Sequence, residues 1–373
     1  MSAGGPGSEA ALAEPPVRLA PSLRSTALAL AVGIAGGWLA FQLRLPLPWM
    51  IGAMSVTTAA AALGAPITMP LGFRQVMVAV LGTMLGSGFS PEMLAHLGDW
   101  ALSLCTLALY GAAAGGAGLV YFRRLWGYDP VTAYFAAMPG GLAEMTLVGA
   151  EMGGDARIIS LTHASRVLLV VLALPFAFQV LIGYDPGARP AIGLPLAEVA
   201  AADLAILAGC GALGFVLARA LRLPAAAVVG PMILSGAVHL AGWTSATPPF
   251  ELVAAAQVVI GTAIGCRFAG VSTRLLSRTV VAAAGGTVVL LSATIAFALA
   301  LAELTGLPVV ALMLAFSPGG LAEMSLIAIA IGADAAFVAT HHVVRIFLIV
   351  VLAPLAFRVM KRRRGDTTED RGV

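Results

Sequence analysis

The feature that most constrains this sequence is a series of twelve apolar runs separated by short polar segments. They lie near 25–43, 47–64, 72–88, 100–121, 131–150, 158–182, 201–220, 225–242, 251–266, 279–302, 308–331 and 336–357. A helix that crosses a membrane needs about 20 mostly apolar residues. Only 10% of the residues are charged, against about 25% in soluble domains. The sequence therefore predicts an all-α polytopic protein in contact with the lipid bilayer.

The second six runs are a copy of the first six. Pro139-Gly140-Gly141-Leu142-Ala143-Glu144-Met145 recurs as Pro318-Gly319-Gly320-Leu321-Ala322-Glu323-Met324, 179 positions later. Asp155, His163, Arg166 and Pro175 recur as Asp334, His342, Arg345 and Pro354, with the same offset. Shared register over this length indicates an internal duplication.

The distribution of arginines favours an inverted second copy. If all twelve runs cross, several arginines between 219 and 278 lie outside, against the tendency of basic residues to stay in the cytoplasm. If the Pro-Gly-Gly run of each copy enters and returns without crossing, nearly all arginines lie inside. We therefore expect ten crossings, two re-entrant segments and both termini in the cytoplasm of a bacterial inner-membrane protein.

The chemistry of the Pro-Gly-Gly motif agrees with a re-entrant segment. Pro139 lacks an amide proton, and Gly140 and Gly141 tolerate unusual dihedral angles. A broken backbone at membrane depth persists only where protein or water covers it. Inverted repeats with paired broken segments are typical of secondary transporters.

These observations divide the chain into five parts. We expect a disordered N-terminal tail over 1–22, a first membrane repeat over 23–182 and a linker over 183–197. A second membrane repeat follows over 198–358, and a basic cytoplasmic tail over 359–373. Each repeat is expected to have about five crossing helices and one broken re-entrant helix.

Glu144 and Glu323 follow the breaks inside apolar runs. An ionisable group at membrane depth is costly and indicates function, here coupling to a proton or cation, or a salt bridge to an arginine. The alternative is a carboxylate that caps the helix starting at the glycines, where the helix dipole favours an anion.

His163 with Arg166, and His342 with Arg345, stand three residues apart and share one face of a helix. An arginine in this position can hold an anionic group with two hydrogen bonds, and the histidine can relay protons. The alternative is a structural Arg–Glu pair that joins this helix to the re-entrant segment.

The free amides after Gly140 and Gly319 form another candidate anion site, because a helix N-terminus presents donors and partial positive charge. The alternative is a simple hairpin tip. Asp155 and Asp334 follow glycines near the start of the next helix and are expected to be N-caps.

The candidate substrate- or ion-binding residues are therefore Pro139, Gly140, Gly141, Glu144, His163, Arg166, Pro318, Gly319, Gly320, Glu323, His342 and Arg345. The sequence has no phosphate loop, dinucleotide fingerprint or His-Glu-x-x-His motif. Three cysteines lack ligand spacing. We expect no enzymatic activity, catalytic residue, cofactor, metal or nucleic-acid partner, and the sequence leaves a homo-oligomer open.

The doubled Pro-Gly-Gly-Leu-Ala-Glu-Met motif, with the downstream Asp, His and Arg, resembles the AbrB family of bacterial integral membrane proteins over residues 25–358. The resemblance implies a membrane regulator of gene expression, and older labels in the family include ammonia monooxygenase. The residues themselves favour a secondary transporter or exporter of a small anionic solute, coupled to protons. The alternative is a membrane regulator or sensor that does not transport.

Overall fold

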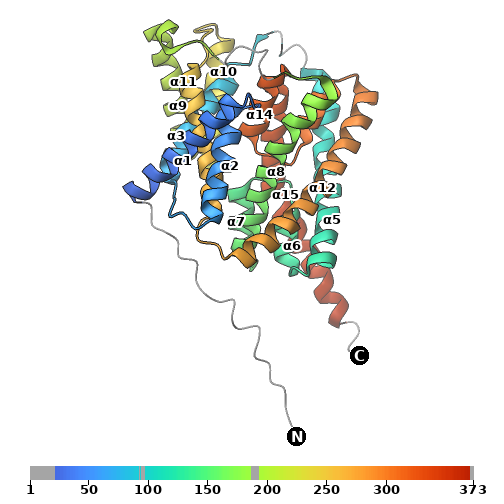
Figure 1. The fold of residues 1–373 in the computed structure, drawn as a ribbon. Coiled ribbons are helices and arrows are strands. Elements are labelled where there is room, and N and C mark those ends of the chain that lie inside the picture. Colours follow the sequence, from blue (N-terminus) through green and yellow to red (C-terminus); the bar gives the residue numbers. More distant parts are fainter. Residues whose placement is uncertain (1–21, 92, 94–96, 186–192, 370–373) are drawn as a thin grey trace.

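The computed structural model describes residues 22–91, 93, 97–185 and 193–369. All regular elements in these ranges are helices (Figure 1). The first repeat contains α1 (Leu23–Gln42), α2 (Pro48–Ala62), α3 (Leu71–Gly86), η2 (Leu97–Trp100), α5 (Ala101–Trp126), α6 (Pro130–Ala137), α7 (Leu142–Glu151) and α8 (Ala156–Ile182). The second contains α9 (Ala201–Ala220), α10 (Ala226–Leu240), α11 (Phe250–Gly265), η4 (Cys266–Phe268), α12 (Thr273–Thr305), α13 (Val309–Phe316), α14 (Leu321–Ile331) and α15 (Ala335–Glu369). The 3-10 turn η3 (Leu196–Glu198) precedes α9.

Seven of the described helices are long and apolar enough to cross a membrane: α1, η2 with α5, α8, α9, α11 with η4, α12 and α15. The other three expected crossings, α2, α3 and α10, have only 15 or 16 residues. At 1.5 Å per residue they extend about 22–24 Å, less than the hydrocarbon core of about 30 Å. Their apolar runs are interrupted early by Pro and Gly, as at Gly64-Ala65-Pro66 after α2. The fold is therefore a multi-pass helical membrane protein with short as well as long helices.

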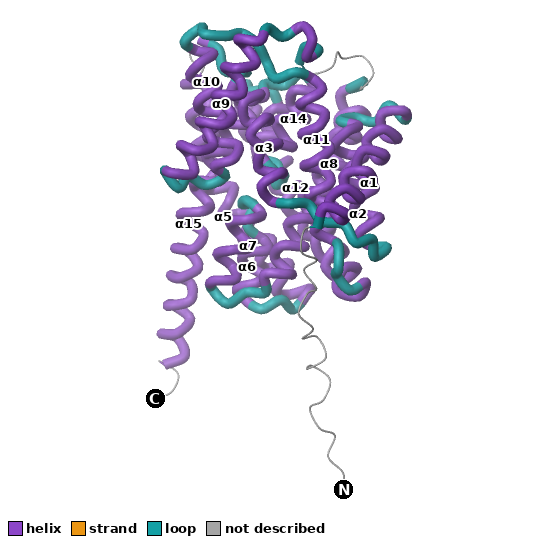
Figure 2. The backbone as a smooth tube through the Cα atoms, turned by 90° about the vertical axis from the view of Figure 1, so that its left-hand side faces the viewer, coloured by secondary structure: helices purple, strands orange, loops and turns teal. Residues whose placement is uncertain are grey.

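Both Pro-Gly-Gly motifs interrupt a helix, as the sequence predicts. α6 ends at Ala137 and α7 begins at Leu142, while α13 ends at Phe316 and α14 begins at Leu321. We call α6 with α7 hairpin 1, and α13 with α14 hairpin 2. Figures 1 and 2 show α6 and α7 near the end of the molecule at which α15 ends, and α14 toward the opposite end. This arrangement agrees with hairpins that enter from opposite faces.

The helices form two bundles that each draw on both repeats. α1, α2, α3, α9, α10 and α11 pack together as the flanking bundle, on the left of Figure 1. α5 to α8 and α12 to α15 pack together as the hairpin bundle, which contains both hairpins. The bundles meet chiefly through α2 and α3 against α8, α14 and α15. The site residues of both hairpins therefore lie in one bundle and beside the second.

Equivalent helices of the two repeats make equivalent contacts in the flanking bundle. α3 packs against α10 and α2 against α11, so the third helix of each repeat contacts the second helix of the other. A Cβ atom on Gly82 would lie 2.5 Å from the carbonyl oxygen of Val228, and one on Gly261 would lie 2.6 Å from that of Met50. The glycines shared by the two copies thus permit close approach of helix backbones, as is common in membranes.

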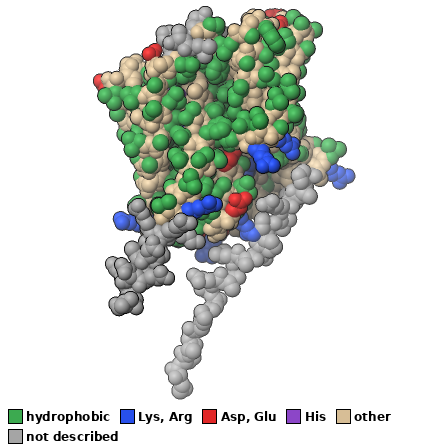
Figure 3. Space-filling view, turned by 180° about the vertical axis from the view of Figure 1, so that it is seen from behind, with side chains coloured by type: hydrophobic (Ala, Val, Ile, Leu, Met, Phe, Trp, Pro, Cys, Tyr) green, Lys and Arg blue, Asp and Glu red, His purple; other side chains and the backbone are tan. Residues whose placement is uncertain are grey.

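On the face of the molecule shown in Figure 3, Lys and Arg side chains lie in the lower half. Basic residues favour the cytoplasmic side, and the expected orientation, which stays a prediction, places this end in the cytoplasm. The start of α12, with Arg274, would then be cytoplasmic, and its end, with Glu303, periplasmic.

Reporter fusions can test this orientation. We expect a fusion after Arg274 to report a cytoplasmic position and one after Glu303 to report a periplasmic position, because α12 joins opposite ends of the bundle (Figure 1). A fusion before Arg24 serves as the control for the cytoplasmic terminus. The opposite result at either end of α12 would contradict the inverted arrangement.

The division of the chain into five parts stays a prediction. α15 continues to Glu369, so the basic cluster 361–364 of the expected tail lies on this helix. Lys and Arg have high helix propensity and can extend it beyond the membrane. The expected N-terminal tail, apart from Ser22, and residues 186–192 of the expected linker lie outside the described residues.

Candidate functional site

The candidate site begins where α8 passes the break in hairpin 1. Arg166 is only 3% exposed, and its guanidinium donates from Nη1 to the carbonyl oxygen of Met138 at 2.9 Å. Nη2 donates to the carbonyl oxygen of Gly140 at 3.2 Å. The break leaves these carbonyls without partners in a regular helix. Arg166 therefore satisfies the broken backbone and fixes hairpin 1 to α8.

His163 completes this contact and is itself fully buried. Its Nε2 lies 2.9 Å from the carbonyl oxygen of Phe135, and its Nδ1 lies 3.1 Å from Nη2 of Arg166. A carbonyl only accepts and a guanidinium only donates, so Nε2 carries the proton and Nδ1 accepts. These partners assign the neutral imidazole. A second proton, on Nδ1, would face the guanidinium and break this contact.

Hairpin 2 is held in the same way by α15. Arg345 donates from Nη1 to the carbonyl of Ser317, and from Nη2 to that of Gly319 at 3.1 Å. His342 Nε2 lies 3.0 Å from the carbonyl oxygen of Leu314, and its Nδ1 lies 3.0 Å from Nη2 of Arg345. The side chain before the proline differs between the repeats, Met138 against Ser317, but only its backbone carbonyl is used. We call each Arg–His–carbonyl set a latch.

Arg166 and Arg345 interact electrostatically within the hairpin bundle, and both interact with Tyr110, a fully buried residue of α5. The Tyr110 hydroxyl forms a hydrogen bond of 3.0 Å with Thr294 Oγ1 of α12. The Nε atoms of both arginines are buried and have no hydrogen-bond partner. Each latch thus contains a buried cationic group with one unused donor.

The glutamates lie at the starts of the second hairpin helices. Glu144 is in the first turn of α7, and Glu323 in the first turn of α14. A Cβ atom on Gly141 or Gly320 would overlap the Oε2 atom of the corresponding glutamate. Each carboxylate is therefore folded back over the N-cap glycine, in the capping position, where the helix dipole favours it.

This geometry corrects one alternative drawn from the sequence. The predicted structural pair between arginine and glutamate is wrong. The arginines bind backbone carbonyls at the break, and the glutamates fold over the helix starts. The arginines still join α8 and α15 to the hairpins, as that alternative supposed. The carbonyls compete successfully because they lie directly across from the guanidinium groups and have no helical partners.

The two glutamates differ in their surroundings. Glu323 is only 6% exposed, and it lies within electrostatic reach of Arg74 on α3 of the flanking bundle. Glu144 is half-buried. The Glu323 carboxylate is therefore at the boundary between the two bundles, where a relative movement of the bundles would change its surroundings.

Asp155 and Asp334 act as N-caps, which confirms the prediction. The Asp155 carboxylate accepts from the amides of Arg157 and Ile158 at 2.8 and 3.1 Å. Asp334 accepts from the amide of Phe337 at 2.9 Å. These bonds satisfy donors at the helix starts that would otherwise have no partner.

Sequence reasoning did not place His341, which has Thr162 as its counterpart. Its Nδ1 lies 2.8 Å from the carbonyl oxygen of Phe337, and its Nε2 lies 2.8 Å from Ser103 Oγ on α5. Tyr110 and Arg74 were also missed as members of the site. A lone polar residue in the middle of an apolar run was the available signal for Tyr110 and for Ser103, but their partners lie too far away in the sequence to be inferred.

The described structure thus brings the predicted residues together as two equivalent groups, one at each hairpin. Pro139, Gly140 and Gly141 form the first break, with Arg166 and His163 beside it. Their counterparts form the second. Whether these residues bind a solute or ion stays a prediction.

Comparison with known proteins finds a family model and relatives that match most of this chain. A family model described as "Transition state regulatory protein AbrB" matches residues 49–361. An "Uncharacterized protein YhjN" of Bacillus subtilis (strain 168) is 30% identical over 372 residues, which cover 90% of this chain and 93% of the relative. A "Putative regulator AbrB" of Escherichia coli (strain K12) is 25% identical over 332 residues, 86% of this chain and 92% of the relative.

Proposed function

We propose that this chain, which belongs to the AbrB family and has a multi-pass helical fold, is a secondary transporter of a small anionic solute. The observation that carries this proposal is the pair of buried guanidinium groups of Arg166 and Arg345. Burying an ion without a counter-ion costs several kcal/mol after relaxation. The carbonyls at the breaks offset part of this cost, and a bound anion would offset the rest.

The unused Nε atoms support an anion as the ligand. Each latch occupies both terminal nitrogens of its guanidinium, while Nε–H of Arg166 and of Arg345 stays buried without a partner. A guanidinium can present two parallel N–H groups to a carboxylate. An anion that enters between the arginines would meet these donors and the combined charge of both groups.

The latches also provide a route for coupling to protons. Protonation of His163 or His342 places an N–H against the neighbouring guanidinium, which weakens the hold on the hairpin. An anion at the arginines would favour the protonated histidine by its charge. Proton and anion would then bind together, and both hairpins would be released for movement.

The two-bundle architecture supports alternating access. The hairpin bundle carries both latches, and the flanking bundle contacts it through few helices. Secondary transporters commonly move one bundle against another around a site near the midplane. Glu323 at the boundary would sense that movement through Arg74.

Proton movement in proteoliposomes tests this proposal. A panel of small carboxylates and amines is presented to wild type and to the double variant Glu144→Gln with Glu323→Gln. We expect a carboxylate-dependent proton flux that falls at least about tenfold in the double variant, because glutamine keeps the shape of the side chain but cannot take up or release a proton. A tenfold fall corresponds to a barrier about 1.4 kcal/mol higher. The matched control, Glu151→Gln with Glu303→Gln, removes two exposed carboxylates from the same bundle and should keep the flux.

A complete lack of flux for every solute in folded protein would contradict the transport proposal. An equal loss of flux in the control variant, or an unchanged flux in the Glu144→Gln and Glu323→Gln variant, would contradict the role of these two glutamates in coupling.

A second candidate function is regulation of gene expression from the membrane. It is favoured by the description of the matching family model and by the name "Putative regulator AbrB" of the Escherichia coli relative. The two functions can be separated in cells that carry the Glu144→Gln and Glu323→Gln variant. Regulation that persists without transport would support a direct role, whereas joint loss would indicate that the transported solute is the signal.

A further inference from the structure

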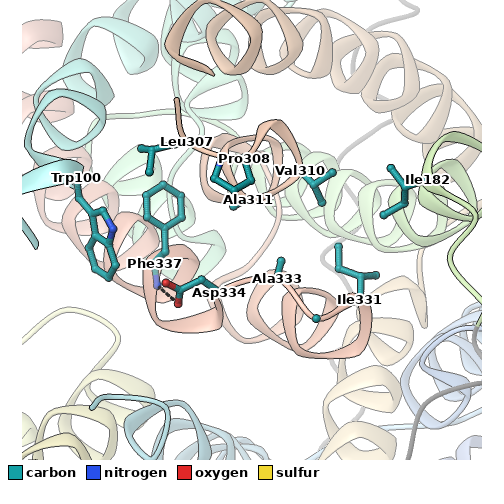
Figure 4. Close-up of a pocket in the computed structure, with 11 residues that line it drawn as sticks. Trp100, Ile182, Leu307, Pro308, Val310, Ala311, Ile331, Ala333, Asp334 and Phe337 are labelled. Atoms are coloured by element: carbon teal, nitrogen blue, oxygen red, sulfur yellow. Dashed lines mark hydrogen bonds between the residues drawn. The ribbon is translucent and has the colours of Figure 1, made fainter. Parts of the chain in front are cut away.

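A cavity of about 380 Å³ lies at the end of hairpin 2 that is away from its Pro-Gly-Gly break, where α13 starts and α14 ends (Figure 4). We call this end of a hairpin its mouth. The cavity lies between the start of α13, the end of α14 and the start of α15, and it is closed on one side by η2. The lining residues are Trp100, Ile182, Leu307, Pro308, Val310, Ala311, Ile331, Gly332, Ala333, Asp334 and Phe337. A volume of this size is within the range of small-molecule sites.

Asp334 provides the single charged side chain of this lining. One carboxylate oxygen accepts from the amide of Phe337 at 2.9 Å, and the residue is otherwise exposed. Figure 4 shows the carboxylate beside the backbone amide of Phe337, joined to it by this hydrogen bond. An apolar wall with one anionic group selects a ligand with an apolar body and one positive charge.

Aromatic rings form part of the cavity wall. Trp100 and Phe337 both line the cavity, and their ring centroids are 5.3 Å apart in an edge-to-face arrangement. The two side chains are only 3% and 2% exposed, so they form a packed apolar side of the cavity. The apolar remainder of the wall, from Leu307 to Ala311, offers contact area to the ligand body.

The equivalent place in hairpin 1 is built differently. There Thr132 Oγ1 accepts from the amide of Asp155 at 2.8 Å, which bridges the start of α6 to the start of α8. Asp129 caps α6 through the amides of Val131 and Thr132, each at 3.0 Å. In hairpin 2 the counterparts are Ala311 and Pro308, which cannot form these bonds. Ala311 and Pro308 therefore remove the hydrogen bonds of the first repeat, and both residues form part of the apolar wall of the cavity.

From these observations we infer that the mouth of hairpin 2 binds a small organic ammonium compound, with its apolar body in the cavity and its ammonium group at the Asp334 carboxylate. This site is separate from the arginines and takes the opposite charge. It therefore goes beyond the proposed anion transport and does not depend on it. A ligand here would contact α13, α14 and α15 together and hold hairpin 2 in its present position.

Equilibrium binding to the purified full-length protein tests the site. The probe is 2-phenylethylammonium, and its binding is measured by titration calorimetry. We expect 2-phenylethanol, which has the same body without the charge, and phenylacetate to bind at least about tenfold more weakly. Methylammonium, which lacks the body, should bind weakly as well.

Matched variants locate the binding. Asp334→Asn should weaken binding of 2-phenylethylammonium about tenfold, while Asp155→Asn, the equivalent position in the first repeat, should leave it unchanged. Asparagine is also a good N-cap, so both variants should remain folded. Equal affinity for 2-phenylethanol, preference for phenylacetate, or equal weakening by the two variants would overturn the inference.

Discussion

Replacement of Arg345 by methionine is expected to lower the free energy of unfolding by about 2–4 kcal/mol, because a buried acceptor without a donor costs about 1–3 kcal/mol. The change removes the donors to the carbonyls of Ser317 and Gly319 and to Nδ1 of His342. Removal of the buried charge also removes its desolvation cost, which offsets part of this loss of stability. The measurement is thermal unfolding of the purified protein in detergent.

The control for this prediction is Arg358→Met, an exposed position on the same helix, which should leave stability nearly unchanged. Arg166→Met should behave like Arg345→Met, since the first latch has the same geometry. If Arg345→Met unfolds at the wild-type temperature, the carbonyls of the break find other donors and the latch does not fix hairpin 2.

Replacement of Gly52 by alanine is expected to destabilise the protein by about 1–3 kcal/mol, the usual cost of overpacking. A Cβ atom at Gly52 would overlap the carbonyl oxygen of Gly36, so α1 and α2 would have to separate. Gly230 stands in the same relation to Gly214 in the second repeat. Gly230→Ala should therefore cost a similar amount, again measured by thermal unfolding.

The matched control for the glycine prediction is Gly209→Ala. Gly209 lies inside α9 and has open space around the position of a Cβ atom. In a helix interior alanine is favoured over glycine by about 1 kcal/mol, so this variant should be as stable as wild type or more stable. A similar gain in Gly52→Ala would mean that the backbones of α1 and α2 are not in close contact.

Several features of the fold were predictable because they depend on local chemistry. Pro139 and Pro318 lack an amide proton, and the glycines after them lack a Cβ atom, so the helix breaks could be read from a few residues. The N-caps at Asp155 and Asp334 follow from hydrogen bonds that reach only two or three residues along the chain. The duplication and its shared glycines were visible as identical letters at a constant offset.

The partners of the buried charges were not predictable in the same way. The sequence places Arg166 and Glu144 in neighbouring segments and suggests a salt bridge, yet the arginine binds Met138 and Gly140 through the backbone. A backbone carbonyl has the same chemistry at every residue, so no side-chain pattern marks the one that will accept. The choice depends on how α8 lies across hairpin 1.

The sequence alone thus determined that this chain is a duplicated helical membrane protein with a broken helix in each half. Only the tertiary structure decided that the arginines hold the breaks, that His341 meets Ser103 across 238 positions, and that the two hairpin mouths differ. Proline, glycine and capping residues affect only the backbone a few residues away, so their effects can be predicted from a short stretch of sequence. Helices in lipid lack an apolar face that would identify their neighbour, so contacts between distant helices are set by close packing of the whole bundle.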